Sequence, residues 1–384
     1  MSVQVSYKKQ FLLGILILLT ILVVVEGIAR TYEFFDPKCG LVGKDVFENT
    51  DPLTVRQICY DFQILQYDQQ TIILYEPNQH YSTTNINSYG MRGPEISKEK
   101  ADDVYRVMFI GGSTAFGSGS TSDETTIPGY LQQKFNNENL DKKIEVINAG
   151  ISGYYSLTEI FYIKNFLLEF EPDLLIVYDG INDSGYSQDN QPFELKYEEN
   201  PQSDSNVVKE TLKQIPFYRT PFVVYRNLNI ENPAIVFKNL VNENYDDDIM
   251  KLNETKMFEN TELWKNRWQD ICELGKEKGF LTIITVQPTL GSGNKPLSHD
   301  EEEMLKERTA TPADYMQKFW DSLVDSLEDL DQVCEKTADL RDVFANTSEP
   351  VYFDPSHISD VGNEIVAQEF YELTLPVIIK DLVN

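Results

Sequence analysis

The feature that most constrains the fold is a regular alternation of short apolar runs with helical patterns, which begins at about residue 104. Each run is rich in Val and Ile and is bounded by turn or polar residues, which is typical of a buried strand. Strands that alternate with helices of this length predict parallel strands joined by right-handed crossovers. We therefore expect an α/β fold with three layers, α/β/α, around a central parallel sheet. The expected strands are 104–110, 144–148, 173–178 and 280–286.

Helical patterns fill the intervals between these runs. Apolar residues recur at helical spacing from 127 to 135 and again from 263 to 274, where Gly279 follows as a stop signal. Ser156 and Glu159 have the spacing of a capping box, which predicts a helix from Ser156 to about Phe170.

Two further regions do not share the alternation. Residues 184–261 are rich in Asn, Asp, Glu, Tyr and Pro, and we interpret them as an insertion at the carboxyl edge of the sheet, either a lid or a surface loop. Residues 30–100 contain short extended pieces such as 71–75 and a turn-rich run at 85–94. They predict a strand-rich collar packed on the main domain at 101–384, or a spacer between that domain and a membrane.

The N-terminus carries a membrane-directed segment. An apolar run interrupted only by Thr20 extends from Phe11 to Val25, and Lys8 and Lys9 precede it. Taken as 11–29 the run is just long enough to span a bilayer, and we favour an uncleaved anchor over a signal peptide. The lysine pair places residues 1–10 in the cytoplasm by the positive-inside rule. We expect a single-pass protein of the cell membrane whose main domain lies outside the cytoplasm.

The composition limits which partners, cofactors and disulfides we expect. The formal net charge of −29, from 62 acidic and 33 basic residues, argues against nucleic acid as a partner. Three histidines and the absence of C-x-x-C and H-E-x-x-H motifs predict no metal site, and no other cofactor is expected. Four cysteines in an oxidising compartment allow one or two disulfides, and Cys272 is equally suited to a small core position; the others are Cys39, Cys59 and Cys334.

The run Val107-Met-Phe-Ile-Gly-Gly-Ser113 ends an expected strand with two glycines and a serine. A serine at the end of a buried strand lies at the rim of the sheet, so Ser113 is the candidate nucleophile. Its base must have a pKa near neutrality, which points to histidine. His80 lies in the collar and His299 in a polar helix start, whereas His357 follows Asp354 by three residues. Asp354 is therefore the candidate acid that orients His357.

A serine that attacks an acyl carbon also needs donors for the oxyanion. Two loops after successive expected strands can supply them, 148–153 and 180–183. Gly153 offers a backbone N–H, and Asn182 offers its side-chain amide. Gly150 is an alternative donor if the register of the first loop differs.

These four blocks together resemble the SGNH (GDSL-like) hydrolase family from about residue 100 onward. The resemblance implies a flavodoxin-like serine esterase that uses no metal, in which Ser113, Asp354 and His357 form the triad. Ser113, Gly153 and Asn182 would form the oxyanion hole. The Gly-Asp-Ser-Leu of the family is here Gly111-Gly-Ser-Thr114, which is similar to the variant of membrane-tethered members.

The resemblance implies an ester substrate, whether a small molecule, a lipid or an acylated glycan. Two alternatives remain open: an O-acetyltransferase or deacetylase acting on cell-surface glycans, and a catalytically silent binding module with the same fold. A P-loop is excluded, because no Lys-Ser or Lys-Thr follows the glycines at 111–120. The elbow of an ordinary α/β-hydrolase would need Gly at the position of Ala115.

Overall fold

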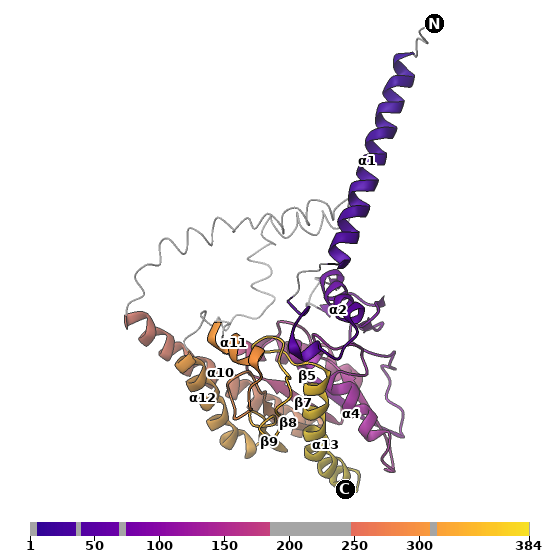
Figure 1. The fold of residues 1–384 in the computed structure, drawn as a ribbon. Coiled ribbons are helices and arrows are strands. Elements are labelled where there is room, and N and C mark those ends of the chain that lie inside the picture. The colour runs from indigo at the N-terminus through magenta and orange to yellow at the C-terminus, as the bar shows by residue number, and fades with distance from the viewer. Residues whose placement is uncertain (1–5, 36–39, 69–73, 185–246, 308–312, 384) are drawn as a thin grey trace. The chain divides into compact units, whose positions relative to one another are not determined.

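A computed structural model describes residues 6–35, 40–68, 74–184, 247–307 and 313–383 (Figure 1). The described residues from Gly40 onward form one compact unit. Helix α1 (Tyr7–Phe35) belongs to a second unit and is treated by itself.

Helix α1 is longer at both ends than the anchor expected at 11–29. Its residues Tyr7–Tyr32 are the candidate membrane span, which contains an 18-residue window with a mean hydropathy of 2.8. Near its end the Arg30 Nε donates to Glu26 Oε1 at 3.0 Å, which partly neutralises the acidic side chain within the helix. By length and composition the helix suits either a membrane anchor or a signal sequence.

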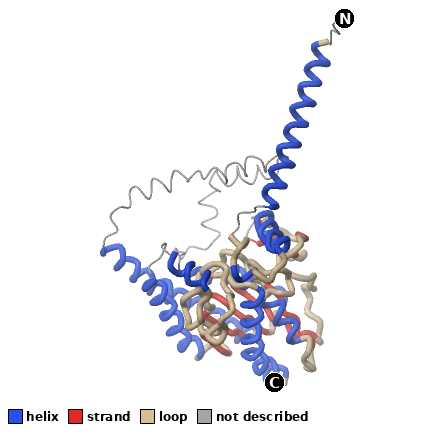
Figure 2. The backbone as a smooth tube through the Cα atoms, viewed as in Figure 1, coloured by secondary structure: helices blue, strands red, loops and turns tan. Residues whose placement is uncertain are grey.

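A five-stranded parallel sheet forms the centre of the compact unit (Figure 2). Its strand order is β6-β5-β7-β8-β9, so β5 and β7 are neighbours in the middle. The three-layer α/β/α expectation is confirmed, and each of the four expected strands is present to within one residue at either end. The strands are β5 (Val104–Gly111), β6 (Lys143–Asn148), β7 (Leu174–Asp179), β8 (Leu281–Val286) and β9 (Lys336–Asp339).

Two hydrophobic clusters cover the two faces of the sheet. Successive side chains of a strand point to opposite faces, so β5 places Met108 and Ile110 in one cluster and Val107 and Phe109 in the other. Helices α5 (Ser156–Asn165), α10 (Asp247–Lys278) and α12 (Ala313–Asp331) supply the first cluster. Helices α4 (Ile127–Phe135), α11 (His299–Glu307) and α13 (Asp360–Leu382) supply the second.

Two helix predictions need correction. The helix from Ser156 ends at Asn165, and Leu167–Phe170 forms a separate 3-10 turn, η2, because Phe166 leaves helical geometry at φ −139°. Ser156 is also not the cap: Thr158 Oγ1 accepts the backbone N–H of Tyr155 instead. Ser156 Oγ donates to Asp183, which holds the start of α5 against the loop after β7.

Only the two ends of the segment 184–261, interpreted as an insertion, lie within the described residues. Helix α10 begins at Asp247, so the last part of that segment is helical. Residues 185–246 lie outside the described residues, and the lid and surface-loop alternatives lie with them.

The collar belongs to the compact unit and is less strand-rich than expected. It contains helix α2 (Pro52–Ile64), whose N-cap is Asp51, and the short turn η1 (Asp45–Phe47). Its strands are two-residue pieces, β1 (Tyr67–Asp68) with β2 (Leu74–Tyr75) and β3 (Gln79–His80) with β4 (Asn85–Ile86). Residues 71–73 of the expected extended run lie outside the described residues.

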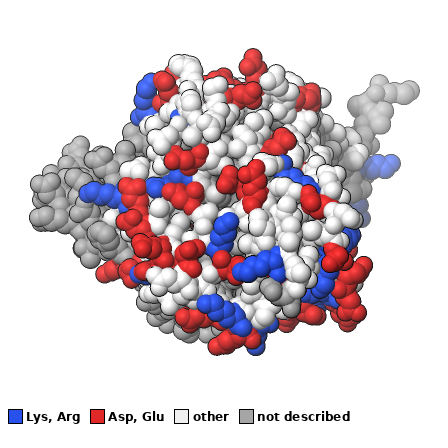
Figure 3. Space-filling view, turned by 90° about the horizontal axis from the view of Figure 1, so that it is seen from below, with Lys and Arg blue, Asp and Glu red and all other residues white. Residues whose placement is uncertain are grey.

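Cys272 in α10 and Cys334 before β9 form a disulfide. Cys59 is disulfide-bonded as well, while Cys39 lies outside the described residues. Acidic side chains are spread over the face in Figure 3, with Lys and Arg between them, as the net charge of −29 suggests.

Candidate active site

Ser113 lies at the first position of a short helix, α3 (Ser113–Phe116), directly after β5. The two preceding glycines are required by close contacts. A Cβ on Gly111 would lie 2.3 Å from the Tyr178 carbonyl oxygen of neighbouring β7. A Cβ on Gly112 would lie 2.6 Å from the Asn182 Nδ2 atom. The Asn182 amide thus crowds the space into which the side chain of an aspartate at position 112 would begin.

The structure brings Ser113, His357 and Asp354 into one hydrogen-bonded chain. His357 Nε2 lies 2.6 Å from Ser113 Oγ, and His357 Nδ1 lies 2.7 Å from Asp354 Oδ2. An ionised carboxylate only accepts, so the imidazole proton resides on Nδ1 and the Nε2 lone pair faces the serine hydroxyl. This arrangement lets His357 take the proton of Ser113.

Asp354 is fixed by its own loop. Its Oδ1 accepts the backbone N–H groups of Ser356 and His357, both at 2.8 Å. Burial acts to raise the pKa of this carboxyl, but the hydrogen bonds to His357 and to the two N–H groups outweigh it. The pKa of Asp354 therefore lies below its ordinary value of 3.8, and the carboxylate stays charged beside the imidazole.

The His357 ring is also held by packing. Phe353 stacks on it with ring centroids 5.6 Å apart and planes 9° apart. Phe353 in turn contacts Phe47 of the collar at 5.7 Å and belongs to the small hydrophobic cluster formed by η1 and α2. A side chain at Gly119 would collide with the Phe353 ring, because its Cβ would lie 2.3 Å from a ring carbon.

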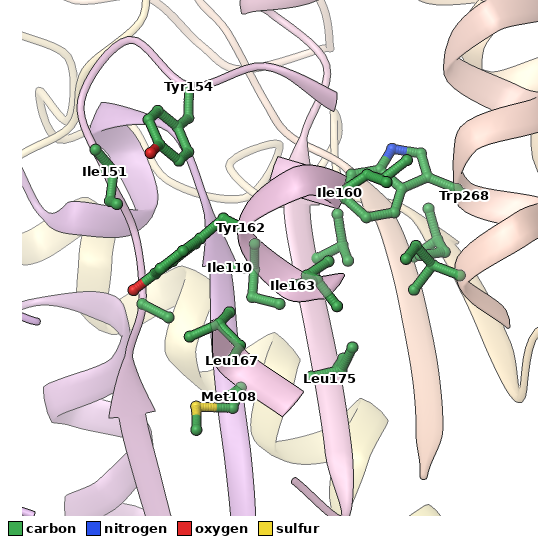
Figure 4. Close-up of a cluster of buried hydrophobic side chains, with 14 of the residues drawn as sticks. Met108, Ile110, Ile151, Tyr154, Ile160, Tyr162, Ile163, Leu167, Leu175 and Trp268 are labelled. Carbon is green, nitrogen blue, oxygen red and sulfur yellow. The ribbon is translucent and has the colours of Figure 1, made fainter. Parts of the chain in front are cut away.

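Gly153 is the better placed of the two glycine donors. It adopts φ 82° in a tight turn closed by the Tyr154 N–H to the Ile151 carbonyl at 3.1 Å, and an added Cβ would meet open space. The Gly150 N–H already donates to Asn148 Oδ1 at 3.1 Å, so it is not free for an oxyanion. Figure 4 shows Tyr154 beside Tyr162 of α5, and their rings are 5.9 Å apart.

Asn182 begins the short turn η3 (Asn182–Ser184) after β7. Its Nδ2 donates to the Tyr154 carbonyl at 2.6 Å, which ties the loops after β6 and β7 together. An amide nitrogen carries two hydrogens, so one remains for a second acceptor. The sequence-predicted residues Ser113, Gly153 and Asn182 thus lie in the segments that follow the neighbouring strands β5, β6 and β7.

Arg92 is a residue of this region that the sequence reasoning missed. Its guanidinium is buried and donates to the carbonyls of Phe116 at 3.2 Å and Gly117 at 2.8 Å, at the carboxyl end of α3. Its Nε donates to Asp123 at 2.8 Å. A cation at a helix carboxyl end is stabilising, and here that helix begins with Ser113. The turn-rich run at 85–94 gave no signal that this arginine is buried.

A cluster of buried carboxyl groups lies behind the loop after β7. Glu159, Asp179 and Asp183 are all nearly inaccessible, and no N–H or hydroxyl donor among the described residues reaches the Glu159 oxygens. Burial, followed by the neighbouring carboxylates, raises the pKa of Glu159. Burial also raises the pKa of Asp179, although Trp264 Nε1 donates to it at 3.0 Å. Arg267 lies 3.7 Å from Asp183, the cluster's only close cation among the described side chains.

The other two histidines lie apart from Ser113. His80 is exposed on β3, where its Nδ1 lies 3.2 Å from Asn85 Oδ1. His299 begins α11 and faces Glu303 at 3.3 Å with most of its side chain exposed. Within the described residues no group of three or more His, Cys, Asp or Glu side chains is arranged to hold a metal ion.

The parallel sheet is that of a three-layer α/β protein, and the hydrogen-bonded serine, histidine and carboxylate at the end of its strand β5 are the candidates for a hydrolytic site. More specifically, residues 109–227 match the GDSL-like Lipase/Acylhydrolase family, which confirms the SGNH (GDSL-like) resemblance. The chain carries a domain of that hydrolase family, and the match supports an ester-hydrolysing enzyme. The matched part includes Ser113, Gly153 and Asn182, whereas Asp354 and His357 lie beyond it.

Solved structures with a similar course of the chain include two acetyl xylan esterases and a lipase/acylhydrolase. The acetyl xylan esterase AlAXEase is 13% identical, with 70% of this chain and 100% of that chain covered and a TM-score of 0.38. Axe2, an acetylxylan esterase from Geobacillus stearothermophilus, is 14% identical over 70% and 93%, with a TM-score of 0.38. A lipase/acylhydrolase from Enterococcus faecalis is 15% identical over 70% and 95%, with a TM-score of 0.39. No curated protein matches the chain.

Proposed function

We propose that the protein is a serine esterase that cleaves carboxylic esters through an acyl-enzyme on Ser113. The observation that carries the proposal is the chain from Asp354 through His357 to Ser113, with separations of 2.7 and 2.6 Å. Three side chains in this order, with the carboxylate fixed by two N–H groups of its own loop, are what a hydroxyl needs to become a nucleophile.

The steps follow from the positions of these groups. His357 Nε2 takes the proton as Ser113 Oγ attacks the ester carbonyl carbon, and the charge on the carbonyl oxygen meets the N–H groups of Ser113 and Gly153 and the Asn182 amide. The imidazolium then protonates the leaving alkoxide, and the acyl group stays on Ser113. Water, deprotonated by the same nitrogen, then attacks the acyl carbon. The bond to Ser113 Oγ breaks, His357 returns the proton to that oxygen, and the carboxylic acid is released.

An active-site label tests this role. A fluorophosphonate should modify the full-length protein at Ser113 and stop hydrolysis of a short-chain aryl ester. Ser113→Ala should lose both label and turnover. Ser122→Ala should keep both, because the hydrogen-bond partner of Ser122 Oγ among the described residues is Thr125, at 3.5 Å. Full turnover in Ser113→Ala, or a folded wild type that takes no label, would disprove the assignment.

We further propose that α1 is an uncleaved anchor with the hydrolase domain outside the cytoplasm. Lys8 and Lys9 precede the apolar stretch, and positive charge on that side favours a cytoplasmic N-terminus. The full-length protein should stay with membranes after carbonate washing, and protease added to intact cells or spheroplasts should digest the domain. Release by carbonate would indicate cleavage, and protection from protease would indicate the opposite sidedness.

Three kinds of ester fit the proposed chemistry: small molecules, lipids and acylated glycans. The same triad passes an acyl group to a sugar hydroxyl if a sugar excludes water from the acyl-enzyme. Product analysis with and without a sugar acceptor separates the two outcomes, because a transferase yields an acylated sugar while a hydrolase yields only free acid.

A further inference from the structure

The collar residue Tyr75 makes contacts that its place in the sequence does not suggest. It lies at the end of β2 and is fully buried. Its ring packs between Tyr67 of β1, at 4.7 Å, and Phe116 of the nucleophile helix α3, at 4.6 Å. Tyr75 therefore connects the collar to the short helix that begins with Ser113.

Its hydroxyl binds one residue of the oxyanion loop twice. The Ser152 N–H donates to Tyr75 Oη at 3.1 Å, and Tyr75 Oη donates to Ser152 Oγ at 2.9 Å. A hydroxyl does both only while it is protonated. Burial raises the pKa of Tyr75 well above 10.0, so the group is neutral at every pH at which an esterase works.

These two bonds act on the peptide that carries the Gly153 N–H. Ser152 and Gly153 occupy the middle of the turn from Ile151 to Tyr154, and the side chains of its two end residues are buried. The middle of the turn has no such packing, because Gly153 is exposed and lacks a side chain. The Tyr75 hydroxyl therefore bonds both the N–H and the Oγ of Ser152 in the middle of the turn, where Ser118 Oγ, at 3.5 Å, and the Tyr67 hydroxyl are further partners of the Ser152 side chain.

We propose that Tyr75 is a positioning residue for the oxyanion hole, because its hydroxyl holds Ser152 and thereby aims the Gly153 N–H. The inference rests on the proposed esterase function. A donor stabilises an oxyanion only if it is held at hydrogen-bond distance before the charge develops. Loss of the Tyr75 hydroxyl should therefore weaken binding of the transition state and leave binding of the ground-state ester unchanged.

The test compares two tyrosine variants of the full chain. Tyr75→Phe keeps both ring contacts and removes only the hydroxyl, and its kcat should fall roughly 10- to 100-fold with KM unchanged. Tyr81→Phe is the matched control, because the Tyr81 hydroxyl binds the Ile64 carbonyl and Gln79 within the collar. The kcat of Tyr81→Phe should stay at the wild-type value, even if its melting temperature falls by as much as that of Tyr75→Phe.

The inhibition constant of a boronic acid is a second measurement, and a loss of stability alone does not change it. Phenylboronic acid forms a tetrahedral adduct on a nucleophilic serine and places an oxygen in the oxyanion hole. Its inhibition constant should rise in Tyr75→Phe by about the factor by which kcat falls, and should not change in Tyr81→Phe. Unchanged kcat and inhibition constant in Tyr75→Phe would overturn the inference.

Ser152→Ala serves if Tyr75→Phe does not fold. It removes the Oγ acceptor and keeps the N–H bond to Tyr75, so kcat should fall less than tenfold but measurably. Unchanged kcat would again overturn the inference. A wild type without turnover or label at Ser113 would instead disprove the proposed function, so the two failures are distinguishable.

Discussion

Two acidic regions near the carboxyl edge of the sheet shift the pKa of a carboxyl group in opposite directions. Asp354 is partly exposed and receives donors from two backbone N–H groups and from His357, and its pKa is lowered. Glu159 is fully buried among carboxyl groups, and its pKa is raised. The comparison shows that the supply of donors, more than the carboxyl group itself, decides whether an acid is charged. We infer that the first region serves the chemistry and the second supports the loop after β7.

The largest effect is expected from Asp354→Asn. Oδ1 already accepts two backbone N–H groups, so the new amide NH₂ must occupy the position that faces His357. The imidazole then has to accept at Nδ1, which leaves the proton on Nε2 and deprives Ser113 of its base. We expect kcat/KM to fall about 10³- to 10⁴-fold in an ester assay, with an unchanged circular dichroism spectrum. A loss below tenfold would show that His357 works without this acid.

Asn182→Ala should have the next largest effect, because Asn182 is a proposed oxyanion donor and directly precedes Asp183 of the second region. We expect the acyl-transfer rate to fall about 10²- to 10³-fold, measured as the burst in pre-steady-state hydrolysis of an aryl ester. Asn182 also ties its loop to the Tyr154 carbonyl, so melting temperature is measured in parallel. An unchanged rate would assign Asn182 to the supporting region.

Glu159→Gln should leave turnover intact and raise stability at neutral pH. The amide has nearly the same volume, needs no proton from solvent and can donate to the adjoining carboxylates. We expect an increase of about 1–3 kcal/mol in the free energy of unfolding, measured by urea denaturation at pH 7.5. A large loss of turnover with retained stability would place Glu159 in the chemical region and break the comparison.

The smallest effects are expected in the pH dependence of stability, where the two regions have opposite signs. A raised folded-state pKa means that the Glu159 contribution is greatest below its ordinary value of 4.5 and is lost as pH rises above it. A lowered folded-state pKa means that the Asp354 contribution is present above 3.8 and is lost as pH falls further. The melting temperature, measured between pH 3 and pH 8, should depend less on pH than in wild type. In Glu159→Gln this should be seen above about pH 4.5, and in Asp354→Asn at the acid end of the range. The same slope in wild type and Glu159→Gln would contradict the first sign.

Local pattern predicted much of the sheet and the loops at its edge. Buried parallel strands are continuous apolar runs, so β5, β6, β7 and β8 were visible in the sequence. Strand β9 was not, because Lys336–Asp339 lies at the sheet edge with partly exposed polar side chains. The break at Phe166 was also missed, since the apolar pattern continues through the 3-10 turn.

The residues of the candidate site also divide into those that the sequence pattern predicts and those that it does not. Ser113, Gly153 and Asn182 follow recognisable strands, and Asp354 with His357 has a local spacing, so these residues were named from the sequence. Arg92 and Tyr75 were not, because their partners are 24 and 77 residues away in the chain. Nothing local distinguishes a buried arginine or a bridging tyrosine from a surface residue in a turn-rich collar. Only the packing of the collar on the sheet reveals what they touch.

The distance along the chain between Ser113 and His357, 244 residues, has a consequence for biosynthesis. A ribosome adds about 5–20 residues per second, so roughly 12–50 s separate the appearance of the serine from that of its histidine. During that interval β6, β7, β8 and β9 are added to the nascent chain, but His357 is still missing. On the proposed mechanism the protein is therefore inert while it is being made, and its first turnover waits for the chain to be nearly complete.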